Sequence, residues 1–562
     1  MSDRAVWLAV LAGALLLAAV HVVWLLRFRS GYVTEWDESG YIALALDDTR
    51  ALKQDGPLGL VDAVLGEGIQ APLVPLSAVP MQLLFGSNVD ASLATIPLFS
   101  IVLVLATFGL ARRLGAPSGW AALAALCVGA APVVADYARL FHFALPATAL
   151  ATAALWALLC SDDLSRRGWA LAFGALVGAM ALARTMTLAF VPGFAVAGLV
   201  LVFSAPGSRR PRFVNLVLSG LAAAVVAGSW YLPNLRSVGR YLLNFGYGTE
   251  SSAYGEEHSP VSIAFWTREL DRLLDALYLP LAAALAVALL AGAWVAIRAG
   301  RPRSRDAWAV VAVALFVAAG YVAVSSSRNV GTAFSLPWVP ALVALAVAGV
   351  AALPSRALRT AAAALLIVAS VVNVAMKAGA VNAMAKPRTL DLPLAGQTTV
   401  LDGRGVIHDE IEGAGYPLPN PAEKIPALHR RWLPAAEELS TFAYRWAQAR
   451  GTEPRLALGF DDLIFSNTRV LLGAELALDR RLQGVFLKPF PHGDTAASYR
   501  QQLRETRTNL LVTGVRKPGV RPGIVVTRSA VEAAARSLGF RPLRRFRLPD
   551  GRPIVVWSKG SG

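Results

Sequence analysis

Long apolar runs constrain this chain more than any other feature of its sequence. A helix needs about 20 predominantly apolar residues to cross the hydrocarbon core of a bilayer. The chain has 562 residues, of which 56% are hydrophobic and 16% charged, which excludes a soluble globular protein. The first run is longer than the apolar part of a signal peptide and has no convincing cleavage site, so we expect it to be retained. About 11 spans are predicted, near residues 5–27, 91–111, 119–136, 140–160, 168–183, 186–206, 213–233, 276–298, 307–326, 333–353 and 358–376.

Arginines alternate between the connections of these spans. Cytoplasmic loops collect Lys and Arg, so the arginine-rich connections are predicted to lie inside, with the N-terminus. They carry at least two arginines each, within 112–113, 166–167, 209–212, 298–305 and 356–359. The alternate short connections carry one each: Arg139, Arg184 and Arg328. This pattern predicts a multi-pass protein of the cell membrane with three larger pieces outside the cytoplasm: residues 28–90, residues 234–275, and the chain from about 377 onward.

The formal net charge of +16 does not indicate nucleic acid, because no basic and aromatic stripe accompanies it. An anionic membrane surface and a phosphate-bearing substrate explain the charge better. Cys127 and Cys160 both fall in apolar runs, so we expect small packing residues rather than a disulfide or metal pair.

The outer pieces differ in kind. Residues 28–90 contain two amphipathic stretches, 39–52 and 58–65, typical of helices in the interface plane. Residues 234–275 form a loop rich in Gly, Ser and aromatic residues. Residues 1–376 are thus predicted to form the transmembrane domain and 377–562 a small α/β domain outside the cytoplasm. Its expected strands lie at 398–401, 456–459, 509–512, 523–526 and 553–557, and its helices include 435–449 and 529–538.

Adjacent carboxylates, Asp37 and Glu38, follow the first apolar run where a membrane helix should meet water. A charge facing lipid costs several kcal/mol, so such acids commonly line a cavity, bind a cation or transfer a proton. The plain alternative is a solvated helix start, where carboxylates interact favourably with the helix dipole.

Other polar residues are predicted to face the same side: Asp136 with Arg139, Arg184, the Glu256-Glu257-His258 cluster, and Arg328. Each has a plain alternative, such as an arginine reaching to the interface or an ordinary loop histidine. Together they predict an outward-opening pocket with carboxylates for proton abstraction and guanidinium groups for a phosphate.

Five short motifs resemble those of polyprenyl-phosphate-sugar-dependent glycosyltransferases of the GT-C fold, in the branch of the aminoarabinose lipid A transferases and protein O-mannosyltransferases. The resemblance covers about residues 1–376. The motifs are residues 36–41 (Trp-Asp-Glu-Ser-Gly-Tyr), 70–76 (Gln-Ala-Pro-Leu-Val-Pro-Leu), 183–185 (Ala-Arg-Thr), 258–260 (His-Ser-Pro) with Phe265 and Trp266, and Arg328 with 334–340 (Phe-Ser-Leu-Pro-Trp-Val-Pro).

The resemblance implies roles for single residues. Asp37 would be the general base of an inverting transfer, and Glu38 would hold it or share its proton. Where relatives carry a second Asp this chain has Leu145-Pro146-Ala147, and the nearest acid, Asp136, is assigned that role. Further residues are expected at the donor phosphate (Arg184, Arg328 and Arg139) and at the substrate (Tyr41, Gln70, His258 and Trp266). Gln70 stands where some relatives place an acid, so no metal or other cofactor is expected. Glu257 and His258 are the minor alternative for a divalent metal.

The sequence therefore predicts a membrane glycosyltransferase that moves a sugar from a polyprenyl-phosphate donor to an envelope lipid, glycan or protein. It has no Gly-rich nucleotide-binding motif, and a lipid-phosphate donor needs none. One alternative is a flippase or transporter of lipid-linked sugars. Three features argue against it: the odd number of spans, the lack of a sequence repeat and the location of the charge on one side. Another is a non-catalytic scaffold that binds envelope polymer.

Overall fold

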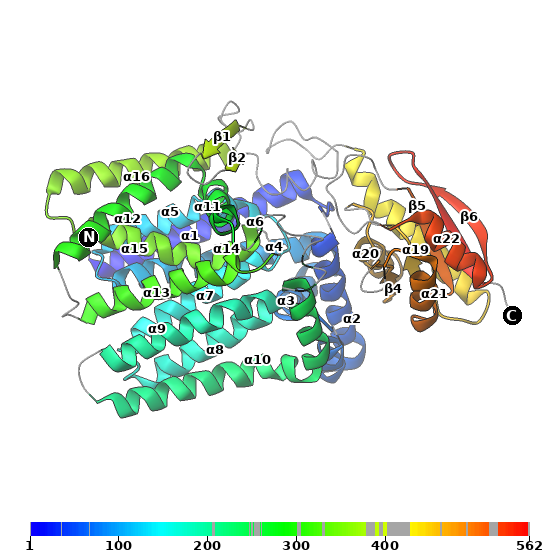
Figure 1. The fold of residues 1–562 in the computed structure, drawn as a ribbon, viewed down its shortest axis with the longest axis horizontal. Helices are drawn as coiled ribbons and strands as arrows, with labels where there is room; N and C mark the ends of the chain where they lie inside the picture. Colours follow the sequence, from blue (N-terminus) through cyan, green and yellow to red (C-terminus); the bar gives the residue numbers. More distant parts are fainter. Residues whose placement is uncertain are drawn as a thin grey trace.

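The computed structural model describes residues 2–34, 36–66, 68–204, 208–246, 248, 251, 259, 261–299, 305–328, 332–377, 388–392, 397–401, 427–460, 464–489, 493–515 and 526–559. A helical bundle forms one end of the molecule and a small sheet domain forms the other (Figure 1). The elements of the bundle are α1 (Asp3–Trp24), the π-helical turn η1 (Leu25–Arg29), α4 (Val89–Arg113), α5 (Ser118–Gly129), α6 (Pro132–Tyr137), α7 (Ala144–Cys160), α8 (Arg167–Ala183), η2 (Thr185–Phe190), α9 (Val191–Ser204), α10 (Arg209–Gly246), α12 (Leu279–Ala299), α13 (Arg305–Ser325), α14 (Thr332–Ser335), η4 (Leu336–Trp338), α15 (Val339–Ala351) and α16 (Arg356–Lys377).

Eight helices of the described residues are long and apolar enough to cross a membrane, so the chain is a multi-pass membrane protein. The other three predicted spans correspond to α5, α7 and α8, which have 12 to 17 residues. The number of spans therefore remains a prediction. Helix α7 is apolar on every side and almost wholly buried, as expected for the centre of a bundle. Helix α1 has a largely exposed apolar surface, which suits contact with lipid.

Small residues allow the bundle helices to approach closely. A Cβ atom on Gly174 of α8 would lie 2.0 Å from the carbonyl oxygen of Ser219 on α10. Gly292 of α12 and Gly349 of α15 face each other in the same way, with 2.7 Å between a Cβ on Gly349 and the Cα of Gly292. Close backbone contact of this kind replaces the hydrophobic driving force that helices lack in lipid.

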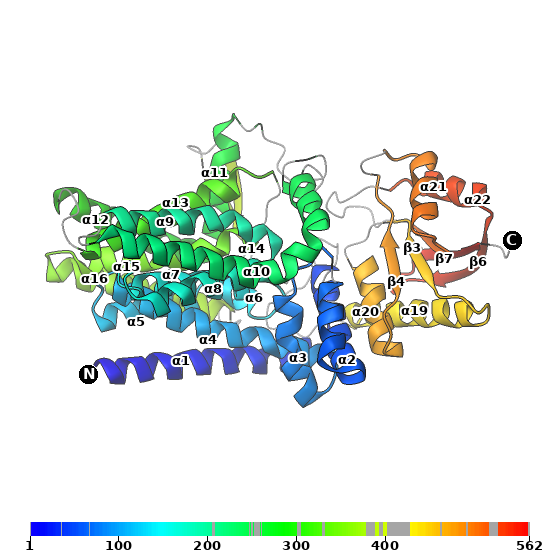
Figure 2. The ribbon, with the colours of Figure 1, turned by 90° about the horizontal axis from the view of Figure 1, so that it is seen from below.

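Three helices run across the direction of the bundle helices (Figure 2). They are α2 (Trp36–Leu65), α3 (Leu73–Phe85) and α11 (Ile263–Leu277). Helix α2 runs across the bundle axis and lies between the bundle and the sheet domain (Figure 2). Gly56, with φ of 71°, and Pro57 kink α2, because this backbone conformation suits glycine and proline cannot donate a helical hydrogen bond. The amphipathic stretches expected at 39–52 and 58–65 are the two limbs of this kinked helix.

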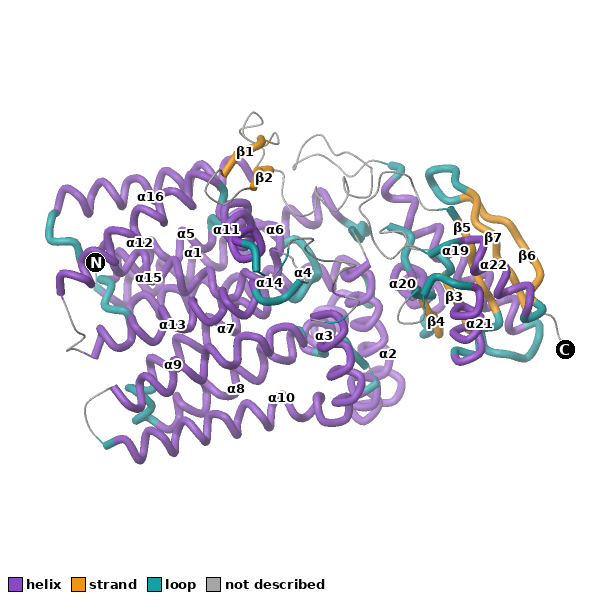
Figure 3. Tube along the Cα trace, in the orientation of Figure 1, coloured by secondary structure: helices purple, strands orange, loops and turns teal. Residues whose placement is uncertain are grey.

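The sheet domain has an α/β architecture, as predicted (Figure 3). The described strands of its larger sheet lie in the order β4-β3-β5-β7-β6, with β4, β3 and β5 parallel and the β5–β7 and β7–β6 pairs antiparallel. In the register, Leu456 lies opposite Leu510 and Val512 opposite Val556. Its elements are η5 (His429–Arg431), α19 (Trp432–Gln448), β3 (Arg455–Leu458), α20 (Asn467–Leu478), β4 (Gln483–Phe486), α21 (Ala496–Glu505), β5 (Leu510–Gly514), α22 (Arg528–Ser537), β6 (Phe540–Arg547) and β7 (Pro553–Lys559).

The predicted strands at 456–459, 509–512 and 553–557 are confirmed as β3, β5 and β7, and the two predicted helices as α19 and α22. The strand expected at 398–401 is β2 (Gln397–Leu401), but it pairs with β1 (Arg388–Leu392) in a separate antiparallel ribbon. The strand expected at 523–526 lies mostly outside the described residues.

Candidate active site

The acid pair directly follows a short loop that joins η1 to α2. Gly31 has φ of 67°, which turns the chain sharply after η1. Residues 32–34 have no regular secondary structure, and α2 begins at Trp36, so Asp37 and Glu38 occupy its first turn. Carboxylates are stabilised there by the positive end of the helix dipole.

Glu38 is fully buried and accepts hydrogen bonds from three parts of the chain. Its Oε2 accepts from Nη2 of Arg29 at 2.6 Å, and from the backbone N and the hydroxyl of Thr34 at 2.7 and 2.9 Å. Its Oε1 accepts from the backbone N of Phe141 at 2.8 Å. A carboxylate with these donors is held in one position, which suits a residue that orients its neighbour.

Asp37 has a different environment, because 35% of its side chain is exposed. Arg184 lies near it, with 3.9 Å between Oδ2 of Asp37 and Nη2 of Arg184. Arg184 is buried where α8 ends, and it donates to the hydroxyls of Tyr41 at 2.7 Å and Tyr241 at 3.3 Å. Its guanidinium carbon lies 4.9 Å from the centre of the Phe143 ring. Arg184 is thus fixed by aromatic residues while the acid beside it stays accessible.

An apolar cavity of about 200 Å³ is lined in part by Phe143, whose ring Arg184 contacts, and by Thr185, the residue after Arg184. Its lining comes from the α6–α7 connection, η2, and the ends of α10, α13 and α14. The lining residues include Phe143, Thr185, Leu188, Leu242, Ser327, Phe334 and Pro337. The site therefore combines a carboxylate, a fixed guanidinium and an apolar cavity.

Asp136 and Arg139, predicted at the same site, make other contacts. Both carboxylate oxygens of Asp136 accept from Nζ of Lys377, at 2.7 and 2.9 Å, and both side chains are buried. The guanidinium of Arg139 lies over the ring of Trp24 at 4.1 Å. The backbone carbonyl of Arg139 accepts a hydrogen bond from Nη1 of Arg29. These contacts place Asp136 against the end of α16 and Arg139 against α1.

The other predicted residues are spread around the site. The Nε2 atom of Gln70 would lie 3.2 Å from a Cβ on Gly40, one turn after Asp37. Trp266 is in α11, and its carbonyl accepts from the hydroxyl of Tyr321. Arg328 is exposed just after α13 and follows Ser327 of the cavity. Glu256, Glu257 and His258 lie outside the described residues.

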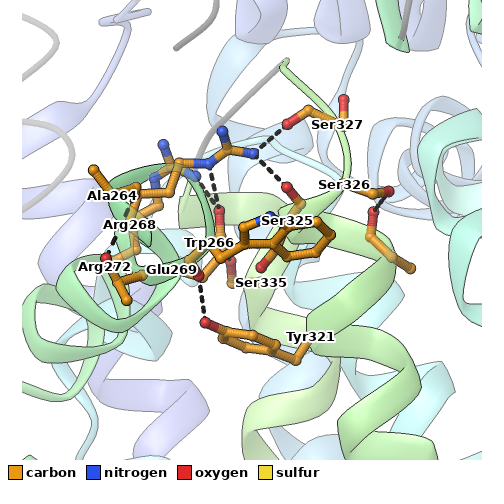
Figure 4. Close-up of polar contacts among 12 residues, drawn as sticks. Ala264, Trp266, Arg268, Glu269, Arg272, Tyr321, Ser325, Ser326, Ser327 and Ser335 are labelled. Atoms are coloured by element: carbon orange, nitrogen blue, oxygen red, sulfur yellow. Dashed lines mark hydrogen bonds and ion pairs between the residues drawn. The ribbon is translucent and has the colours of Figure 1, made fainter. Parts of the chain in front are cut away.

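Sequence reasoning missed a buried charged cluster around α11 (Figure 4). Arg268 donates to the carbonyls of Ser325, at 2.8 Å, and Ser327. Glu269 accepts from the hydroxyl of Ser335. The cluster joins α11 to the ends of α13 and α14 beside the cavity. Adjacent opposite charges within the strongly amphipathic stretch 263–277 were a signal that could have found it.

Tyr241 was missed as well. It lies at the end of a long apolar helix, and nothing in its spacing links it to Arg184. Among the described residues, no three His, Cys, Asp or Glu side chains group as a metal site would require.

Comparison with solved structures identifies the fold. The chain has the GT-C-like architecture of membrane glycosyltransferases, which confirms the predicted fold class. It is similar to ArnT from Cupriavidus metallidurans bound to undecaprenyl phosphate, with 18% identity, a TM-score of 0.52, and coverage of 97% of this chain and 98% of that one. The apo state of ArnT gives a TM-score of 0.51 at 18% identity, with the same coverage of both chains.

The chain is also similar to the arabinofuranosyltransferase AftD from Mycobacteria, with 16% identity and a TM-score of 0.54. That match covers 98% of this chain and 40% of AftD. No protein-family model and no curated protein sequence matches the chain.

Proposed function

We propose that this protein is a membrane glycosyltransferase that takes a sugar from a polyprenyl-monophosphate donor. The observation that carries the proposal is the pairing of accessible Asp37 with fixed Arg184 beside an apolar cavity. ArnT, which shares the fold, was solved with undecaprenyl phosphate bound, which supports a lipid of this class as the partner.

The donor would lie with its phosphate at Arg184 and the start of its isoprenoid chain in the apolar cavity. A guanidinium presents a planar, permanently charged set of donors to phosphate oxygens. Arg184 is already oriented by Tyr41 and Tyr241, so it needs little reorganisation as charge develops on the leaving phosphate. Arg328 is the second proposed phosphate contact, from the exposed end of α13.

The transfer would be a single inverting displacement. The Asp37 carboxylate accepts the proton of the acceptor hydroxyl or amine as that atom bonds to the anomeric carbon of the sugar. The bond between the anomeric carbon and the phosphate oxygen breaks, and the polyprenyl phosphate leaves with the bonding electron pair. Glu38 holds the loop and so fixes the direction of the Asp37 side chain. The acceptor is an envelope lipid, glycan or protein.

A transfer assay with the purified full-length protein tests this proposal. Radiolabelled polyprenyl-phosphate sugar is incubated with an envelope fraction and either the wild-type protein or Asp37→Asn. We expect label to move to the acceptor only with wild-type protein. Label that crosses a vesicle bilayer without transfer would indicate a transporter instead, and polymer binding without turnover would indicate a scaffold.

The site and the sheet domain are proposed to lie outside the cytoplasm, which the alternation of arginine-rich connections supports. An Arg545→Cys variant tests this, because Arg545 is exposed and the native Cys127 and Cys160 are buried. An impermeant thiol reagent should label the variant in intact cells. Labelling only after lysis would contradict the proposed topology.

A further inference from the structure

The sheet domain contacts the loop that directly precedes the acid pair. Arg469 in the first turn of α20 is almost completely buried, and its Nη2 donates to the carbonyl of Val33 at 2.8 Å. Arg430 donates to the carbonyl of Ser30 in the same loop at 2.6 Å. Side chains of α19 and α20 belong to the same continuous apolar cluster as those of the bundle. The two parts of the chain are therefore packed together at this loop.

A short series of contacts connects Arg469 to Asp37. Val33, which Arg469 holds, precedes Thr34, whose backbone N and hydroxyl both donate to Glu38. Glu38 in turn is the neighbour of Asp37 in the first turn of α2. A shift of the Val33 carbonyl would move Thr34 away from Glu38 and turn the first residues of α2. The contacts thus run from the sheet domain to the proposed base.

Helix α20, which carries Arg469, also packs against α2 close to Asp37. Ser466 caps α20 by accepting from the backbone N of Arg469, at 3.3 Å, which fixes the start of the helix. Thr468 then lies against Gly40, where a Cβ would be 3.2 Å from the Thr468 methyl group. Gly40 is three residues after Asp37, on the same face of α2. A side chain at position 40 would require Thr468 or Gln70 to shift, so glycine favours this close approach of α20 to the acid pair.

A second set of contacts joins the same helices away from the acid pair. Arg481, just after α20, donates to Asp47 of α2 at 2.8 Å, and Arg50 of α2 pairs with Glu475 of α20. These residues join the domains without touching the loop 30–34. They provide a matched control for the effect of domain contact alone.

We propose that Arg469 is a positioning residue for Asp37, so that the sheet domain completes the active site by fixing the acid loop. The inference rests on the proposed function for its catalytic consequence. Its structural part, the ordering of residues 30–41, stands without it. A buried guanidinium that donates to a buried carbonyl orders both, because removal of either partner leaves a buried polar group unsatisfied.

Three variants of the full-length protein test the proposal: Arg469→Ala, Arg469→Lys and the control Arg481→Ala. With Arg469→Ala, kcat should fall by about tenfold or more while the donor KM changes by less than about threefold. Arg469→Lys keeps a cationic donor and should recover most of the lost kcat. Arg481→Ala should keep kcat within about twofold, because the Arg481 side chain is half exposed and its contact lies elsewhere on α2.

Hydrogen exchange of the same samples provides a readout that does not depend on activity. Peptides covering residues 30–41 should exchange faster in Arg469→Ala than in wild type, and at the wild-type rate in Arg481→Ala. Equal exchange of this segment in Arg469→Ala and the control would overturn the proposal even if the wild-type protein showed no transfer. Faster exchange together with an inactive wild type would contradict the proposed function alone.

More conservative variants test the proposal if Arg469→Ala does not fold. If Arg469→Ala does not yield monodisperse protein, Arg469→Lys and Arg469→Gln are compared, since both keep a donor but reach less far. Arg469→Gln should show a lower kcat and faster exchange in residues 30–41 than wild type, and Arg469→Lys should stay closer to wild type than Arg469→Gln does. Wild-type values for both quantities in Arg469→Gln would overturn the proposal.

Discussion

Two ion pairs in this molecule each join an aspartate to a cation, but they differ in burial and in the distance between the charged groups. Asp136 and Lys377 are both less than a tenth exposed, and both carboxylate oxygens are bound at 2.7 and 2.9 Å. Asp37 and Arg184 are 3.9 Å apart, and the acid is 35% exposed. A buried, fully bonded pair cannot exchange partners without leaving a charge uncompensated. We propose that the looser pair admits a substrate between its members, and that exposure distinguishes this catalytic pair from a structural Asp136–Lys377 pair.

Asp37→Asn and Asp136→Asn should separate the two pairs with the largest effect. Asp37→Asn keeps size and most hydrogen bonding but cannot take a proton, so turnover should fall by about 10²–10⁴ with folding intact. Asp136→Asn leaves Lys377 buried without its counter-charge, which should cost about 3–5 kcal/mol of stability.

Transfer rate per folded molecule and thermal unfolding are measured for both variants. We expect Asp136→Asn to keep its rate at temperatures where it is folded. If its rate instead fell as far as that of Asp37→Asn, Asp136 would be a second catalytic acid, as the sequence first suggested.

Arg184→Ala and Lys377→Met extend the comparison to the cations. Arg184→Ala removes a charge-assisted contact worth about 1.5–3 kcal/mol, so use of the donor should weaken about tenfold to a hundredfold. Lys377→Met should lower stability and leave donor kinetics unchanged. The transfer rate is measured against donor concentration for both variants. Wild-type donor kinetics in Arg184→Ala would show that Arg184 does not bind the donor phosphate.

Glu38→Gln sharpens the contrast within the acid pair itself. The amide keeps the shape of the carboxylate but loses the ion pair with buried Arg29, so the thermal unfolding temperature should fall. Its rate loss should be smaller than that of Asp37→Asn, because Gln still accepts from Thr34 or Phe141. The prediction fails if Glu38→Gln is as stable as wild type yet fully inactive.

A third ion pair, Glu475 with Arg50, should have the smallest effect, which is on how the unfolding temperature depends on pH. Burial raises the pKa of Glu475 from 4.5 to about 7, although Arg50 and Arg481 oppose this shift and Asp479 adds to it. The folded protein therefore binds this proton more tightly than the unfolded chain does. This contribution to stability is present below about pH 4.5 and is lost as the pH rises through 7.

The unfolding temperature of the wild type should thus decrease between pH 5 and pH 8 more than that of Glu475→Gln. A shift of a few degrees is expected. Identical pH profiles for the two proteins would show that Glu475 does not titrate in this range.

Much of this architecture could be predicted from local sequence patterns. Apolar runs of membrane length predicted the helices of the bundle, and short apolar runs between turn residues predicted β3, β5 and β7, because both signals depend on neighbouring residues. The acid pair was recognisable for the same reason, since charge next to an apolar run is unusual.

Contacts between distant residues could not be predicted in this way. Asp136 and Arg139 lie near the acids in the predicted topology, but their partners, Lys377 and Trp24, depend on how α16 and α1 pack. The pairing of Arg184 with Tyr241 depends on the length and course of α10. Helix α20 has no strong apolar pattern, so nothing in its sequence signalled that it would meet α2.

The hydrogen bond between Arg469 and Val33 also bears on the time at which the site is assembled. The two residues are 436 positions apart, so the loop that leaves the first helix is synthesised long before its last support. A chain interrupted after Arg184 but before α20 would contain the proposed base, its neighbour and Arg184, yet would lack the residue proposed to fix the loop before them. If Arg469 fixes this loop as proposed, the acid pair reaches its final order only after α20 has been synthesised.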